Sequence, residues 1–369
     1  MKIMHLSDLH IGKQIYEQSL IEDQKYILNQ ILQIIKQENV SVLMLCGDIY
    51  DRAIPPSEAV LLFDYFLTEL KKMNIKVLMI AGNHDSKERL SYAKNILEND
   101  NIFIETKVKD KIRKISIEDV DFYLLPYTKP IDVKEYFPEV TDYTSCIKEL
   151  INNTDIDKSR KNIILSHQFV TGSNIDLQTS DSEVLSLGGM DNVDISVYND
   201  FDYVALGHIH RSQKLLKEEI RYSGSILKYS FSESKYKKSV PIIDTTDMSI
   251  VLKELSPFRD LKDIEGNMDE LLKKSSNDYI RAILTDEEEL YDPINKLRKK
   301  YPNILKIEFK NKRSVYNDYD KNIKNIKEKS VLDLFEEFFL SQNNISLNEH
   351  ERDIINEIIK EVNDETTNS

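Results

Sequence analysis

Five short apolar runs in this chain each end in a cluster of residues that commonly bind metal ions. The runs span residues 3–6, 42–46, 77–81, 163–165 and 203–206, and the clusters are Asp8-x-His10, Gly47-Asp48-x-x-Asp51, Gly82-Asn83-His84-Asp85, Ser166-His167 and Gly207-His208-x-His210. Short apolar runs bounded by turn residues are typical of buried strands. Because ligands bind outside the carboxyl ends of strands in an open α/β sheet, the pattern predicts that the five clusters meet in one crevice.

The spacing within the clusters suits the coordination of two ions. Residues i and i+2 of an extended chain project to the same side, so Asp8 and His10 can hold one ion together, and His208 and His210 repeat this spacing. A carboxylate has two oxygens and can bridge two cations, and Asp48 is the natural bridge. The predicted metal ligands are Asp8, His10, Asp48, Asn83, His167, His208 and His210.

The charge of this ligand set favours phosphate chemistry. Two divalent ions bring four positive charges, whereas Asp8 and Asp48 supply only two negative ones, and a positive site attracts a phosphate and lowers the pKa of bound water. Two ions roughly 3.5–4 Å apart can hold an attacking hydroxide and the phosphoryl oxygens for in-line displacement. Mixed oxygen and nitrogen ligands favour Mn²⁺, with Mg²⁺, Fe²⁺ or Zn²⁺ as alternatives.

His84 has a different predicted role, because it stands beside the ligand Asn83 but is expected to face the substrate. As an imidazolium it would stabilise the developing charge or protonate the leaving oxygen. Asp51 and Asp85 are predicted to orient His84 through their carboxylates, with loop capping as the alternative for both. His5 and His350 fall outside the clusters, and we expect them to be structural or exposed.

Composition sets wider limits. With 369 residues, 40% hydrophobic content and 9% aromatics, the chain is expected to be globular. No stretch approaches the roughly 18 apolar residues needed to span a bilayer, which favours a soluble, cytoplasmic protein without a membrane partner. The net charge of -14 argues against a nucleic-acid partner, but residues 330–369 hold ten acidic and only two basic residues, so the tail carries much of it.

The pattern along the chain predicts four parts. Residues 1–255 alternate strands with amphipathic helices at about 20–37 and 57–72 and are expected to form two sheets packed face to face. Residues 256–312 fit a small α+β module, and 313–330 fit a linker rich in Lys, Asn and Asp. Residues 331–369 show two amphipathic helices, which either pack back on their own domain or dock on a partner protein.

The five clusters resemble the signature of the calcineurin-like metallophosphoesterase superfamily, which is D-x-H, GD-x-x-D, GNH-[DE], a lone histidine and GH-x-H. The resemblance covers about residues 1–255 and implies a two-sheet α/β sandwich. It also implies that one ion is held by Asp8, His10, Asp48 and His210, and the other by Asp48, Asn83, His167 and His208. His84 would then be the catalytic histidine that is not a ligand.

Within that superfamily the chain resembles the SbcD family of bacterial nuclease subunits. The resemblance lies in residues 2–13, in Ser180-Asp181-Ser182-Glu183 with Gly188-Gly189, and in residues 222–233, where Ile226 replaces a usual proline. It implies an exonuclease on double-stranded DNA and an endonuclease on hairpins or single strands, with residues 256–312 capping the site and binding DNA. It further implies that residues 331–369 attach to an SbcC-type coiled-coil ATPase, that the chain is a homodimer within a heterotetramer, and that the chain itself binds no nucleotide.

Two alternative functions stay open at this point. Gly47-Asp48-Ile49-Tyr50-Asp51-Arg52 approaches the phosphatase pattern GD-x-x-DRG, with Ala53 in place of the last glycine, so a phosphomonoesterase or protein phosphatase is one alternative. A non-catalytic binding scaffold is the other, although every predicted ligand is present in this chain. The fold class that we predict is therefore α/β, with a metallophosphoesterase sandwich, a small α+β cap and a C-terminal helical tail.

Overall fold

The computed structural model describes residues 1–172, 175–183, 191–288, 290–310, 332, 335–336, 339–340, 347–348, 350–356 and 358–359. The chain forms two compact units, the first made of residues 1–263 with 278–280 and the second of residues 264–277 with 281–369. The division falls at Asp263, beyond the predicted boundary at 255, because the segment that follows residue 255 still packs on the first unit. The predicted linker at 313–330 lies outside the described residues.

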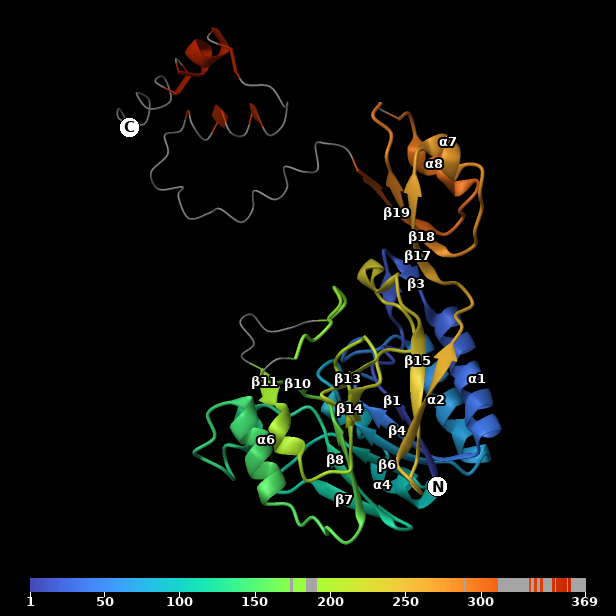
Figure 1. The fold of residues 1–369 in the computed structure, drawn as a ribbon, viewed down its shortest axis with the longest axis vertical. Helices are drawn as coiled ribbons and strands as arrows, with labels where there is room; N and C mark the ends of the chain where they lie inside the picture. The colour runs from blue at the N-terminus through green and yellow to red at the C-terminus, as the bar shows by residue number, and fades with distance from the viewer. Residues whose placement is uncertain are drawn as a thin grey trace. The chain divides into compact units, whose positions relative to one another are not determined.

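Two six-stranded sheets form the first unit (Figure 1). The strands of one sheet are β1 (Lys2–Leu6), β4 (Val40–Cys46), β5 (Lys76–Ile80), β6 (Ile102–Glu105), β15 (Lys238–Asp244) and β16 (Ser249–Leu255), in the order β16-β15-β1-β4-β5-β6. The strands of the other are β7 (Arg113–Ile117), β8 (Val120–Leu125), β9 (Lys161–Ser166), β12 (Tyr203–Leu206), β13 (Gln213–Leu215) and β14 (Lys217–Tyr222), in the order β13-β14-β12-β9-β8-β7.

The main core lies between these sheets. One cluster of buried side chains joins Ile3, Val42 and Leu78 from the first sheet to Phe122 and Leu165 from the second. Apolar side chains on one face of each sheet leave water together when the two faces meet, which is the dominant favourable contribution to folding. The predicted sandwich of two sheets is confirmed.

Helices cover the outer faces. α1 (Ile21–Glu38) and α2 (Ser57–Lys72) match the predicted helices and contact the first sheet at β4 and β5, respectively. α6 (Tyr143–Asn152) buries Cys146, Ile147 and Leu150 in a second core cluster on the other sheet. The smaller elements are α3 (Lys87–Leu90), α4 (Lys94–Leu97), α5 (Pro130–Val133), the strand pairs β2 (Gln14–Ile15) with β3 (Gln18–Ser19) and β10 (Phe169–Thr171) with β11 (Asn192–Asp194), and 3₁₀ turns at Glu98–Asp100, Ile195–Tyr198 and Phe231–Glu233.

The five clusters follow five neighbouring strands. In the first sheet β1, β4 and β5 are adjacent and parallel, and in the second sheet β9 and β12 are adjacent and parallel. Parallel neighbours end at the same edge of a sheet, so each sheet presents its clusters along one edge. The topology therefore places the five clusters at the carboxyl ends of neighbouring parallel strands, as the sequence predicts.

The second unit carries a three-stranded sheet of β17 (Leu261–Gly266), β18 (Tyr279–Leu284) and β19 (Ile304–Phe309), with α7 (Met268–Leu271) and α8 (Pro293–Arg298). The small α+β module predicted for residues 256–312 is thus present. β17 and α7 were not predicted, because the strand contains three charged residues and the helix has a single turn. In the tail, the described residues 350–356 are helical, and the rings of Phe335 and Phe339 stack with centroids 6.4 Å apart.

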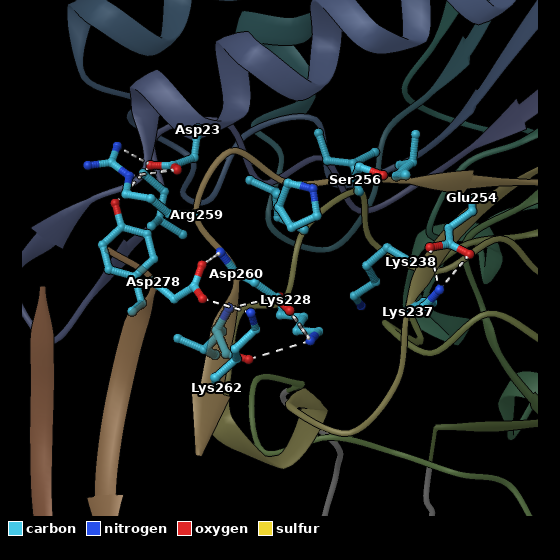
Figure 2. Close-up of a pocket in the computed structure, with 17 residues that line it drawn as sticks. Asp23, Lys228, Lys237, Lys238, Glu254, Ser256, Arg259, Asp260, Lys262 and Asp278 are labelled. Atoms are coloured by element: carbon cyan, nitrogen blue, oxygen red, sulfur yellow. Dashed lines mark hydrogen bonds and ion pairs between the residues drawn. The ribbon is translucent and has the colours of Figure 1, made fainter. Parts of the chain in front are cut away.

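A pocket of about 270 Å³ lies where the chain leaves β16 (Figure 2). Asp23 of α1 is buried there and accepts two hydrogen bonds from the Arg259 guanidinium, at 3.0 and 2.6 Å, and one from the Tyr279 hydroxyl at 2.8 Å. The five basic side chains that line the pocket all have carboxylate partners. The pocket therefore offers no unpaired cation to a phosphate, and the contacts of Asp23 tie Arg259 and Tyr279 to α1 within the first unit.

We expect Asp23→Ala to destabilise the protein. The substitution removes the partner of Arg259, whose side chain is 21% exposed, and of the Tyr279 hydroxyl. Loss of one partner of a buried ion pair is costly, and after allowance for the partial exposure of Arg259 the expected loss is about 2 kcal/mol. Urea unfolding measures it. The control is Glu69→Ala, which breaks the exposed ion pair with Lys72 and should lower the free energy of unfolding by less than about 0.5 kcal/mol. Equal losses of stability in the two variants would contradict the anchoring role of Asp23.

Candidate metal centre

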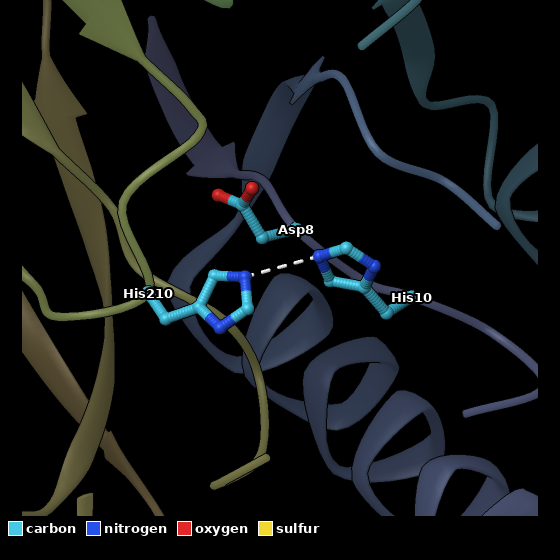
Figure 3. A group of neighbouring side chains, drawn as sticks. All are labelled: Asp8, His10 and His210. Atoms are coloured by element: carbon cyan, nitrogen blue, oxygen red, sulfur yellow. Dashed lines mark hydrogen bonds between the residues drawn. The ribbon is translucent and has the colours of Figure 1, made fainter. Parts of the chain in front are cut away.

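The first group of predicted ligands comes from the loops after β1 and β12 (Figure 3). Asp8, His10 and His210 each offer one ligand atom, and these three atoms lie within 4.8 Å of one another. The Nε2 atoms of His10 and His210 are 3.0 Å apart, and all three side chains are buried. A carboxylate and two imidazoles thus converge on one point.

The second group lies beside the first. His167 Nε2 is 3.3 Å from Asp48 Oδ2 and 3.1 Å from Asn83 Oδ1, and His208 Nδ1 is 3.0 Å from the same Asn83 oxygen. Asp48 Oδ2 also lies 3.7 Å from His10 Nε2, so its carboxylate stands between the two groups. The structure therefore brings all seven predicted ligands together, and Asp48, the predicted bridge, lies between the two groups.

These spacings fit metal coordination. Two ligand atoms about 2.1 Å from an ion and at right angles to each other lie about 3.0 Å apart, and most of the distances above are 3.0–3.3 Å. Burial lowers the pKa of His208 to about 3 and that of His10 well below its usual value, so both rings are neutral and free to donate a lone pair. The donor set of carboxylate, amide and imidazole groups suits divalent ions.

Four of the seven predicted ligands have an unusual backbone conformation. The φ angles are 51° at Asp8, 43° at His10, 50° at Asp48 and 98° at His208. Such conformations cost free energy in residues other than glycine and persist where the surroundings fix them. Here hydrogen bonds join the loops, from Asp8 N to Gly47 O at 3.0 Å, from His10 N to Asp48 O at 3.0 Å and from His208 N to Asp8 Oδ1 at 3.0 Å.

Two glycines of the clusters are required by close packing. A Cβ on Gly47, which has φ +86°, would lie 2.3 Å from His167 Nδ1. A Cβ on Gly82 would lie 2.1 Å from Asp48 Oδ1. Any side chain at either position would therefore displace a predicted ligand, which explains why glycine precedes Asp48 and Asn83 in the sequence.

His84 is placed differently from the predicted ligand histidines. Its side chain is 23% exposed, whereas those of His10, His167 and His210 are at most 2% exposed. Its Nδ1 lies 2.9 Å from the main-chain oxygen of Asp51 and donates a proton to it, which turns Nε2 toward the site, 4.0 Å from Asp48 Oδ2. His84 therefore borders the predicted ligands and is open to solvent.

Asp51 and Asp85 have contacts other than those predicted. Asp51 holds His84 through its main-chain oxygen, while its carboxylate pairs with Lys13 at 2.8 Å and lies 3.7 Å from His10 Nδ1. The Asp85 carboxylate accepts hydrogen bonds from the main-chain N–H groups of Ile49, Tyr50 and Gly82, at 2.9–3.2 Å. Asp85 thus fits the loop-capping alternative, because side-chain oxygens of aspartate readily bond to nearby backbone N–H groups.

Sequence reasoning missed two residues that hold the loop of His10. Gln24 of α1 is fully buried; its Nε2 donates to His10 O at 2.7 Å, and its Oε1 accepts from Gly12 N at 2.9 Å. The Tyr229 hydroxyl donates to Leu9 O, and its ring contacts those of His10 and His210. Gln24 could have been found, because it is a polar residue on the apolar stripe of a helix.

Among the residues that the structure describes, no helix combines the length and the apolar character needed to cross a bilayer.

The comparisons with known proteins concern both units. Residues 1–212 match the calcineurin-like phosphoesterase family, and residues 257–343 match the type 5 capsule protein repressor C-terminal domain. The SbcD subunit of the SbcCD nuclease from Staphylococcus epidermidis is 32% identical over 375 residues, covering 97% of this chain and 98% of that protein. Two solved structures are each 12% identical to this chain, one from Thermus thermophilus and the other a dimetal phosphatase from Danio rerio. Their TM-scores are 0.41 and 0.42. Each match covers 69% of this chain, and the matches cover 99% of the Thermus thermophilus chain and 96% of the Danio rerio chain.

Metal binding is expected to release a proton from His167. Burial by itself lowers the pKa of His167, but the nearby Asp48 carboxylate outweighs burial and raises it to about 9. The metal-free protein therefore keeps this proton at neutral pH, whereas a metal ligand must lose it. The apparent Mn²⁺ affinity should rise up to about tenfold per pH unit between about pH 6.5 and 8.5. Calorimetry in buffers of different ionisation enthalpy counts the released protons, and release of none at about pH 7.5 would contradict the expectation.

Proposed function

Since this chain belongs to the calcineurin-like phosphoesterase family and is a homologue of SbcD nuclease subunits, we propose that it is a divalent-metal-dependent phosphodiesterase that hydrolyses DNA. The observation that carries the proposal is the convergence of seven proposed ligand side chains, of which all but Asn83 are buried, beside one partly exposed histidine, His84. Buried ligands hold ions, and an exposed imidazole next to them can reach a bound substrate.

The proposed ligands divide between two ions. Asp8, His10, Asp48 and His210 would hold one, and Asp48, Asn83, His167 and His208 the other, which follows the two groups of short distances. We propose Mn²⁺ as the native ion, with Mg²⁺, Fe²⁺ or Zn²⁺ as alternatives, because the donors are oxygens and imidazole nitrogens. When bound, the ions supply positive charge for the phosphate and a hydroxide at neutral pH.

His84 supplies the proposed proton transfer. Its Nδ1 is committed to Asp51 O, so Nε2 is the atom that faces the substrate. A proton on Nε2 would be donated to the leaving oxygen as the phosphodiester bond breaks, and the positive ring would stabilise the charge that develops on the phosphate. The main-chain N–H of His84 donates to Asp48 Oδ1 at 2.9 Å, so the same residue also orients the proposed bridging carboxylate.

The substrate and partner follow from the relative that spans nearly the whole chain. Its name makes it part of a nuclease complex of two components, SbcC and SbcD, and its coverage includes the second unit and the tail. For this chain we propose exonuclease activity on double-stranded DNA, endonuclease activity on hairpins or single strands, and a cytoplasmic location. We also propose that it forms a homodimer, which assembles with an SbcC-type coiled-coil ATPase into a heterotetramer, and that the second unit contacts DNA.

The test compares a phosphodiester with a phosphomonoester in the presence of Mn²⁺. The protein should cleave hairpin DNA and bis(p-nitrophenyl) phosphate, and clear preference for p-nitrophenyl phosphate would contradict the proposal. His84→Ala should lower turnover by about 10²–10⁴-fold, the range for a general acid, while elemental analysis finds wild-type metal content. His350→Ala changes an exposed histidine of the tail and should act as wild type. If His84→Ala lost both the bound metal and turnover, the result would indicate that His84 is a metal ligand and would contradict its proposed role.

Docking of the ATPase subunit is expected to need the tail. Ile354 and Ile358 are four residues apart on a helix and are 44% and 49% exposed, which suits contact with a partner. A chain truncated after Lys329 should keep metal-dependent diester hydrolysis but lose binding to the ATPase in a pull-down assay. The double variant Ile354→Glu and Ile358→Glu should weaken binding similarly, and Asp353→Ala should not. Retained binding by the truncated chain would place the docking surface elsewhere.

A further inference from the structure

The loop at residues 180–183 contacts the proposed metal ligand His210, and we propose that Ser182 is a positioning residue that connects the buried carboxylate of Glu233 to the His210 ring. This inference rests on the proposed metal-dependent function and names a residue outside the five clusters. Ser182 Oγ lies 2.7 Å from His210 Nδ1 and donates to Glu233 Oε1 at 2.9 Å. The serine thus stands between the ring and a negative charge.

The direction of these hydrogen bonds follows from the proposed coordination. His210 Nε2 faces His10 Nε2 and is the atom that would bind the ion, so the neutral ring carries its proton on Nδ1. Nδ1 then donates to Ser182 Oγ, and the hydroxyl proton of Ser182 is left to donate to Glu233. Metal-bound histidines commonly donate their second ring N–H to a carboxylate, which fixes the ring and makes it a stronger ligand. Here a serine hydroxyl is inserted between the two groups.

Glu233 is built to stay ionised. It is fully buried, and its carboxylate accepts from Tyr229 N at 3.0 Å, from Ser230 N at 3.1 Å and from Lys238 Nζ at 2.5 Å. Lys238 is the cationic partner of this carboxylate, and its side chain is also buried. A fixed negative charge therefore lies at the end of the hydrogen-bonded chain that starts at His210.

The main chain of His210 is held by the loop at residues 180–183 and by Lys238. Glu183 Oε1 accepts from His210 N at 2.6 Å, and Lys238 Nζ donates to His210 O at 2.8 Å. Together with Ser182 these residues fix the backbone and the ring of one proposed ligand. The resemblance to SbcD proteins includes Ser180–Glu183 and the segment ending at Glu233 but gave them no role; these contacts supply one.

The arrangement predicts that Ser182 controls metal affinity at one position. Ser182→Ala leaves Nδ1 without its acceptor and separates His210 from Glu233, and loss of such a partner typically costs 10–100-fold in metal affinity. Mn²⁺ titration without DNA, followed by electron paramagnetic resonance, should show one of two ions bound about 10–100-fold more weakly while the other is unchanged. Ser182→Thr keeps the hydroxyl and should restore the affinity.

Ser232→Ala is the matched control. The Ser232 hydroxyl accepts a hydrogen bond from Asp181 N, which belongs to the loop at residues 180–183, at 3.0 Å, but it does not bond to His210. It should bind both ions as wild type does. Wild-type affinity in Ser182→Ala would overturn the inference, as would equal loss in Ser232→Ala or no recovery in Ser182→Thr, because each outcome points to packing alone. Fewer than two ions bound by the wild-type protein would instead contradict the proposed function, so the two failures are distinguishable.

Metal binding and the loop should also be linked in the opposite direction. If the contact between Ser182 and His210 strengthens the binding of the ion, then binding of the ion stabilises this conformation of the loop by the same free energy. Amide hydrogen exchange in residues 175–183 should slow on addition of Mn²⁺ to the wild-type protein and change much less in Ser182→Ala. Equal slowing in both proteins would overturn the role of the Ser182 hydroxyl.

Discussion

The Asp8 carboxylate joins the two sheets, and the rest of the site depends on this contact. Asp8 follows β1 of the first sheet, where its N–H bonds to Gly47 O after β4, and its carboxylate accepts the N–H of His208 after β12 of the second sheet. Burial raises the pKa of Asp8, so its negative charge is costly unless positive charge lies nearby. In the proposed metal centre a divalent ion would supply that charge, so the residue that joins the two sheets would also be a metal ligand.

The fold and the identity of the gathered residues were largely predictable, because both follow from local patterns. Apolar runs gave the central strands, and the stripe in residues 20–37 gave α1 to within one residue at each end. The conformations were not predictable, because tertiary contacts decide them. Nothing local shows that Asp8, His10, Asp48 and His208 adopt positive φ, or that His208 turns Nδ1 toward Asn83. β17 escaped prediction since charged residues interrupt its apolar pattern.

The residues that hold the ligands were harder to predict than the ligands themselves. Gln24, Ser182 and Tyr229 are polar residues from three separate segments, and each contacts a residue of another segment, 14, 28 and 220 residues away in the sequence. A ligand must be one of a few residue types, whereas any hydroxyl or amide can hold a ligand in place. For Asp85 the sequence left two roles open, to orient His84 or to cap a loop, and its carboxylate bonds to main-chain N–H groups of two loops, which fits the second role.

Charge decides how an acidic chain can attract a nucleic acid. The chain has a net charge of -14, and the basic side chains lining the pocket beside β16 are all paired with carboxylates. Without ions, Asp8 and Asp48 are offset mainly by the protonated His167, so the site would not attract a phosphate. In the proposed site, two divalent ions would reverse the sign of the local charge. The proposed function thus places the attraction for the scissile phosphate at the metal centre, and leaves affinity along the rest of the strand to the second unit or to a partner.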